Sequence, residues 1–153
     1  MIDCIAGYHL NPWTCGIAKF NDILGRHLGV PVVGIRDLTP DTVRRPLLSI
    51  KISEFSPADA AELDAWSLAH TGEFELFLHA FDGTPVEQRL VAGAARVYCG
   101  NTELYRELRS ARPRIQARRF DQGRMADRLQ DIAEGHDFTP GAALNRGDWR
   151  SEW

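Results

Sequence analysis

The chain has 153 residues, of which 44% are hydrophobic and 25% charged, and its formal net charge is -3. These values are typical of a globular protein of about one domain, and the slight negative charge speaks against a general nucleic-acid binder. The three cysteines show no CxxC spacing, so neither a zinc site nor a disulfide framework is expected.

The N-terminal stretch "MIDCIAGYHL" has no basic leader region, and its apolar run is too short to cross a membrane. The expected compartment is therefore the cytoplasm. Residues 2–8 predict a strand buried on both faces, because the run is apolar without strict alternation. Thr14 is expected to cap a helix over about 15–28, which Gly29 ends.

Strands and helices then alternate along the chain. Further strands are expected at 30–35, 46–52, 74–81 and 95–101. The pair Ser56-Pro57 begins one helix, and "TPVE" (84–87) begins another with a capping box. This alternation predicts the α/β class, as a Rossmann-like three-layer sandwich around a mainly parallel sheet of about five strands.

Residues 1–112 are expected to form this α/β domain, and residues 113–153 a C-terminal helix and tail that pack on it. The arginines between Arg106 and Arg128 indicate either a solvated helix face or a phosphate or partner contact. Trp149 and Trp153 need a surface that buries them. That surface would be this domain, a second copy in a homodimer, or another domain.

Ligands of parallel α/β sheets bind outside the carboxyl ends of the strands, which directs attention to "HLNPWTCGIAKF" (9–20). Thr14, Cys15 and Gly16 lie where a strand end leads into a helix N-terminus, and such N-termini bind phosphate. Lys19, one turn further, would add positive charge. Neither a P-loop nor a GxGxxG motif is present, and the loop taken alone favours the alternative, a connector whose Gly16 allows close helix–strand packing.

Two later residues are candidates of the same kind. His79 stands near a strand end, where it would act as a general base or be a core-edge histidine bound to backbone. Asn101 closes the last expected strand and would contact a ligand or cap the next helix. The chain has no GxSxG motif, and Cys15 has no evident catalytic partner.

The stretch "GYHLNPWTCGIAKFNDILGRHLGVPVVGI", together with "FELFLHAF" and "VEQRLVAGAARVYCGNTELYREL", resembles the N-terminal domain of GT-B glycosyltransferases of the family 4 type. The resemblance covers residues 2–110. It implies that Gly16 lies near the diphosphate of a UDP- or GDP-sugar donor, that His79 lines the acceptor side, and that Asn101 is the polar residue at the late strand. No other cofactor is implied.

Nothing after Arg112 resembles the second domain of such enzymes, which holds most of the nucleotide sugar. The resemblance therefore implies an acceptor-side domain that transfers sugar to a sugar or lipid-linked acceptor, at a membrane surface or away from one, with a second domain or a partner chain. The alternative is a non-catalytic α/β module that binds a nucleotide or a protein. A small flavodoxin-like hydrolase or transferase is a third interpretation, for which no catalytic motif is present.

Overall fold

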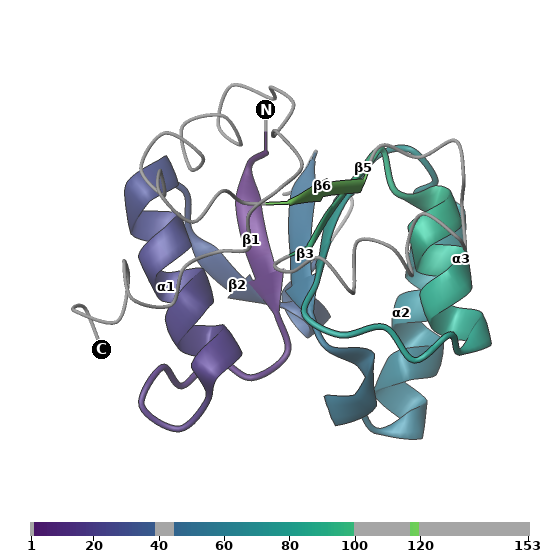
Figure 1. The fold of residues 1–153 in the computed structure, drawn as a ribbon, viewed down its shortest axis with the longest axis horizontal. Helices are drawn as coiled ribbons and strands as arrows, with labels where there is room; N and C mark the ends of the chain where they lie inside the picture. Colours follow the sequence, from purple (N-terminus) through teal and green to yellow (C-terminus); the bar gives the residue numbers. More distant parts are fainter. Residues whose placement is uncertain (1, 39–44, 100–116, 120–153) are drawn as a thin grey trace.

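The computed structural model describes residues 2–38, 45–99 and 117–119, and these form an all-parallel sheet with helices on both faces (Figure 1). The strands are β1 (Cys4–Gly7), β2 (Val32–Gly34), β3 (Pro46–Ile50), β4 (Glu75–Leu78), β5 (Arg96–Cys99) and β6 (Ala117–Arg119). Their order across the sheet is β2-β1-β3-β4-β5-β6. The predicted Rossmann-like α/β fold with a parallel sheet is confirmed, and β6 is a strand that the sequence did not predict.

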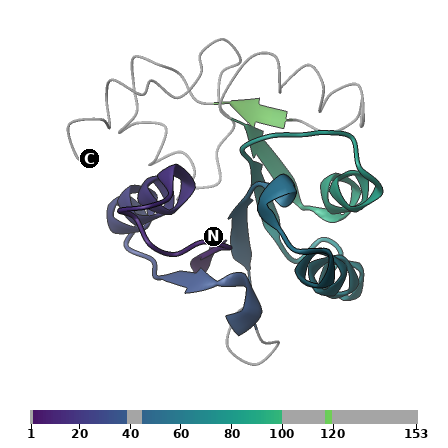
Figure 2. The ribbon, with the colours of Figure 1, turned by 90° about the horizontal axis from the view of Figure 1, so that it is seen from below.

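Three α-helices are described, and they lie on opposite faces of the sheet (Figure 2). Helix α1 (Gly16–Leu28) covers one face, whereas α2 (Pro57–Ala69) and α3 (Pro85–Gly93) cover the other. Short 3-10 turns follow β2 at Ile35–Asp37 and β3 at Ile52–Glu54. The chain leaves β1 toward β2 in one direction and continues from β3 to β6 in the other. The direction of winding therefore reverses between β1 and β3.

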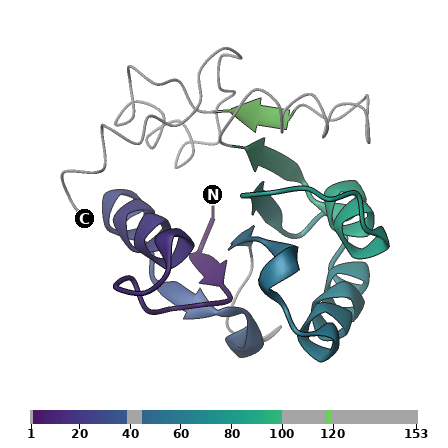
Figure 3. The ribbon, with the colours of Figure 1, turned by 60° about the horizontal axis from the view of Figure 1, so that its bottom comes forward.

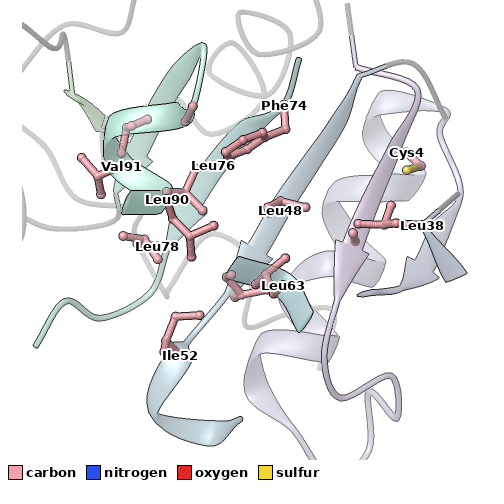
Figure 4. Close-up of a cluster of buried hydrophobic side chains, with 14 residues drawn as sticks. Cys4, Leu38, Leu48, Ile52, Leu63, Phe74, Leu76, Leu78, Leu90 and Val91 are labelled. Atoms are coloured by element: carbon pink, nitrogen blue, oxygen red, sulfur yellow. The ribbon is translucent and has the colours of Figure 1, made fainter. Parts of the chain in front are cut away.

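The two faces of the sheet carry two separate buried clusters, because successive side chains of a strand alternate between faces. Leu48, Leu76 and Leu78 belong to the larger cluster beneath α2 and α3 (Figure 4). Leu47 and Phe77 belong to the smaller cluster beneath α1. Strands β1, β3 and β4 are buried along their whole length, which explains their nearly continuous apolar sequences.

Three of the predicted helix boundaries are confirmed. The Ser56 side chain accepts a hydrogen bond from the Asp59 backbone N–H at the start of α2, with proline at the first helical position. Thr84 and Glu87 form a complete capping box at the start of α3. Gly29 ends α1 with φ of 68°, in the left-handed region that favours glycine.

Other expectations at this level were wrong. The N-cap of α1 is Cys15 and not Thr14, because Thr14 lies inside a turn whose backbone N–H groups bond to Asn11. The strand expected at 74–81 ends at Leu78, so Phe81 lies beyond it and packs against the cluster beneath α2 and α3.

Several predictions lie outside the described residues. They concern the role of Asn101, the helices expected after it, the tail with Trp149 and Trp153, and nearly all of the segment 113–153. The arginine-rich segment contributes only the backbone of β6 to the described structure.

Candidate functional site

The candidate site lies at the carboxyl edge of the sheet, around the reversal point between β1 and β3 (Figure 3). Three neighbouring strands deliver polar or backbone groups to this edge. The loop 8–15 runs from β1 into α1, Lys51 follows β3, and His79 follows β4. Because β1, β3 and β4 are adjacent and parallel, groups that follow them directly in sequence meet at one end of the sheet.

The loop before α1 is shaped by Asn11. Its side-chain Oδ1 accepts a hydrogen bond from the Trp13 N–H at 2.9 Å, and its carbonyl accepts from the N–H groups of Thr14 and Cys15 at 3.3 and 3.2 Å. The Thr14 hydroxyl also donates to this carbonyl, at 3.5 Å. These bonds form a compact turn, which delivers the chain into α1 at an exposed Gly16.

The N-terminus of α1 differs from those of α2 and α3. Its N-cap, Cys15, makes no side-chain capping hydrogen bond, and no acidic residue lies in the first turn. By contrast, Ser56 and Asp59 serve the first turn of α2, and Thr84 and Glu87 that of α3. The partial positive charge of the first turn is thus balanced by side chains in α2 and α3 and not in α1.

Lys19 points its ammonium group at the ring of Trp13, with Nζ 5.5 Å from the ring centroid. The residue is only 8% exposed, whereas Trp13 is 84% exposed. This cation–π contact gives Lys19 a partner inside the loop, so its charge is less available to a phosphate than the sequence suggested.

His79 lies on the face of the sheet that α1 covers, and its ring packs against Phe20 and Phe77 with centroid distances of 5.1 and 4.7 Å. Its Nε2 atom is 2.9 Å from the Ser49 hydroxyl, and its backbone N–H donates to the Ile50 carbonyl. Burial and the positive charge of Lys51 lower the pKa of His79 from 6.5 to about 3. The imidazole is therefore neutral near pH 7 and is a weak base.

The structure adds polar residues that the sequence analysis did not single out. Asn21 and Ser49 are both fully buried, and the Asn21 Nδ2 group donates to the Ser49 carbonyl at 3.4 Å. Asn21 Oδ1 has no hydrogen-bond partner among the described residues. Both residues could have been noticed in the sequence as polar residues at core positions. Asn21 stands on the core-facing side of α1, and Ser49 interrupts the apolar run "PLLSI".

A hydrogen-bonded network joins Tyr8, which follows β1, and Arg36, which follows β2, to Asp59 in the first turn of α2. The Tyr8 hydroxyl and the Arg36 guanidinium each donate to Asp59 at 2.6 Å, and the Ser56 N–H donates to the Tyr8 hydroxyl. The hydrogen bonds from Arg36 and Tyr8 lower the pKa of Asp59 to about 2. All members of the network are paired, which indicates a structural role.

Within residues 2–38 and 45–99, no group of three or more histidine, cysteine, aspartate or glutamate side chains is arranged to hold a metal ion. The described helices are all too short or too polar to cross a membrane. The Cys4 thiol is buried, and this burial raises its pKa to about 11, which makes it unreactive.

Comparison of the chain with protein-family models, with curated proteins and with solved structures finds no match in any of the three. The fold is therefore established as Rossmann-like α/β from the structure alone.

Proposed function

We propose that this chain is the acceptor-side, N-terminal domain of a GT-B-type glycosyltransferase. It would take part in transfer of a sugar, such as a hexose, from a UDP- or GDP-sugar only together with a second domain or a partner chain. One observation carries the proposal: the uncapped N-terminus of α1, Lys51 and His79 follow three adjacent strands at one edge of the sheet.

Each of these groups has a chemical role in the proposal. The free N–H groups that begin at Gly16 would bind a phosphate, with Thr14 and Cys15 lining the approach. Lys51 would supply the positive charge, since the ammonium of Lys19 is already paired with Trp13. His79, being neutral, would hold a hydroxyl of the acceptor by a hydrogen bond and would not remove its proton. Asn101 remains a proposed contact that lies outside the described residues.

The proposal is tested by titrating the full chain with inorganic phosphate, UDP-glucose and GDP-mannose while recording its amide NMR spectrum. We expect the amides of Gly16, Ile17 and Ala18 to shift, because they would donate to the phosphate. The variant Gly16→Trp should lose this response, while the control Ala58→Trp, in the first turn of α2, should keep it. Unchanged amides at the start of α1, or an unaltered response in Gly16→Trp, would contradict the proposal.

Sugar transfer itself needs a separate assay. The chain alone should transfer no sugar from either donor, because one Rossmann-like domain provides a single wall of the cleft. Transfer that appears only after a second domain or chain is added would support the glycosyltransferase interpretation. Transfer by the chain alone would show that the site is complete without a partner, contrary to the proposal.

A second function, a non-catalytic nucleotide- or protein-binding module, is favoured by two exposed apolar side chains. Leu10 and Trp13 are 51% and 84% exposed and lie in the same loop before α1. Such a loop would suit contact with a protein. If UDP or GDP bound as tightly as the corresponding sugar nucleotide, and no added chain produced transfer, this second function would be preferred.

A further inference from the structure

We infer that Ser49 is a positioning residue, which holds His79 in the tautomer that carries its proton on Nδ1. His79 therefore presents an N–H donor, and not a basic nitrogen, at the carboxyl edge of the sheet. The assignment of the tautomer stands on the hydrogen bonds of these two residues. Its use for holding a ligand oxygen rests on the proposed function.

The first step concerns the hydroxyl of Ser49. Ser49 lies in β3 opposite Phe77 of β4, and it is completely buried. A buried hydroxyl must donate its hydrogen to an acceptor, because leaving it unpaired costs about 1–3 kcal/mol. Among the described residues its one hydrogen-bond partner is His79 Nε2, at 2.9 Å. A ring nitrogen accepts only when it carries no proton, so the proton of the neutral ring is on Nδ1.

The other neutral tautomer, with the proton on Nε2, would leave the Ser49 hydroxyl without an acceptor for its hydrogen. If Nε2–H donated to the serine oxygen, the serine hydrogen would need a second acceptor. The buried oxygen of Asn21 does not serve, because it makes no hydrogen bond with Ser49 or any other described residue. A doubly protonated ring is disfavoured as well, since burial and the charge of Lys51 oppose it.

The second step concerns Nδ1, the ring nitrogen that does not take part in the hydrogen bond with Ser49. The buried side-chain polar atoms that lack a hydrogen-bond partner among the described residues are Asn21 Oδ1 and Trp66 Nε1. His79 Nδ1 is not one of them, and the residue as a whole is only partly buried. Phe20 and Phe77 pack against the ring and hold its orientation. The result is a fixed N–H donor at the carboxyl edge of the sheet.

The test is a long-range ¹H–¹⁵N correlation spectrum of the histidine rings in the full chain at pH 7. We expect Nδ1 of His79 to show the shift of a protonated nitrogen and Nε2 that of an unprotonated one. In Ser49→Ala, Nε2 loses its donor, and the ring should move to the Nε2–H form that an unconstrained imidazole prefers. In Ser49→Thr, which keeps the hydroxyl, the Nδ1–H form should return.

Two results would overturn the inference: an Nε2–H ring in the native chain, or an Nδ1–H ring that persists in Ser49→Ala. The amide spectrum of each variant shows whether it is folded, and the native spectrum decides the tautomer even if a variant is not. Addition of glucose, which offers the hydroxyl groups of a sugar acceptor, separates the two proposals. A ring that has the expected tautomer but whose Nδ1 signal ignores the probe would contradict the proposed function and leave the role of Ser49 standing.

Discussion

Gly7, the last residue of β1, lies against Asn21 of α1. A Cβ atom at this position would lie 2.8 Å from Nδ2 of Asn21, a distance at which one of the two groups must move. Asn21 has little freedom to move, because it is fully buried and bonded to the Ser49 carbonyl. Gly7 is thus a glycine that close helix–strand packing requires, a role expected as an alternative for Gly16.

The substitution Gly7→Ala should therefore destabilise the protein by about 1–3 kcal/mol, the usual cost of inserting a methyl group into a packed interior. Urea denaturation would measure the change. The matched control is Gly93→Ala at the end of α3, where a Cβ would lie 3.5 Å from Phe74, an ordinary contact. Equal stabilities of the two variants would show that Asn21 yields to the added methyl group.

The lowered pKa of His79 determines the direction in which the stability of the protein changes with pH. The folded protein binds this proton only near pH 3, whereas the unfolded chain binds it at about 6.5. Stability should therefore fall as the pH drops from about 6.5 toward 3, by at most about 1.4 kcal/mol per pH unit. Between pH 6.5 and 5, unfolding of His79→Gln should depend less on pH than that of the native chain. Parallel pH profiles of the two proteins would contradict the assigned shift.

Among the elements, the three described α-helices differ in how their N-termini are satisfied. Side chains cap α2 and α3, and the capping signals were readable because Ser56-Pro57 and Thr84 to Glu87 are local patterns. For α1 the true N-cap, Cys15, carries no such signal. The helix start after it depends on the turn around Asn11, which a local pattern does not reveal.

This difference predicts a trade-off at the N-terminus of α1, where a residue that caps the helix should stabilise the protein and weaken phosphate binding. Cys15 already has the extended backbone of an N-cap, with φ of -135° and ψ of 123°. In Cys15→Asp, the carboxylate should cap the first turn and raise stability by about 0.5–1 kcal/mol. The same carboxylate would occupy and screen the N–H groups proposed for phosphate, so binding of inorganic phosphate should weaken. Thermal melting and the NMR titration measure the two effects.

Cys15→Ala is the matched control, and it should change neither property appreciably, because the cysteine makes no capping hydrogen bond. A stabilised Cys15→Asp that binds phosphate as well as the native chain would place the phosphate elsewhere.

For the molecule as a whole, the network of Tyr8, Arg36 and Asp59 joins the segments that follow β1 and β2 to the first turn of α2. Asp59 ionises near pH 2 in the folded protein, below its ordinary value of 3.8. Its contribution to stability is thus present above pH 3.8 and is lost as the pH falls toward 2.

Asp59→Asn should lower the melting temperature at pH 7, and the difference from the native chain should shrink as the pH approaches 3. Asp22→Asn is a suitable control, because the Asp22–Arg26 pair is an exposed contact at 3.6 Å within one helix. If both variants melted alike at pH 7, the network would contribute no more than a surface ion pair.

The fold was predictable to a greater extent than the site. Local patterns mark the apolar strands, the end of α1 at Gly29 and the capped starts of α2 and α3. These patterns are sufficient to predict the α/β class with a parallel sheet. The pairing of Ser49 with His79 joins residues from different strands, and it depends on the register of β3 against β4. The partner of Lys19 depends on where the loop places Trp13. Single-sequence patterns contain neither kind of information.

The position of β1 between β2 and β3 affects the order in which the chain acquires structure during synthesis. One edge of β1 is paired once β2 has emerged from the ribosome, but the other waits for β3, which begins at Pro46. Until then the nascent β1–α1–β2 unit exposes a row of unpaired backbone groups, and its second face lacks the helix that begins at Pro57. Translation arrested just before Pro46 emerges should therefore leave a species that chaperones bind and proteases cut. Arrest after β5 has emerged, when β1, β3 and β4 are paired along both edges, should leave a species that resists both.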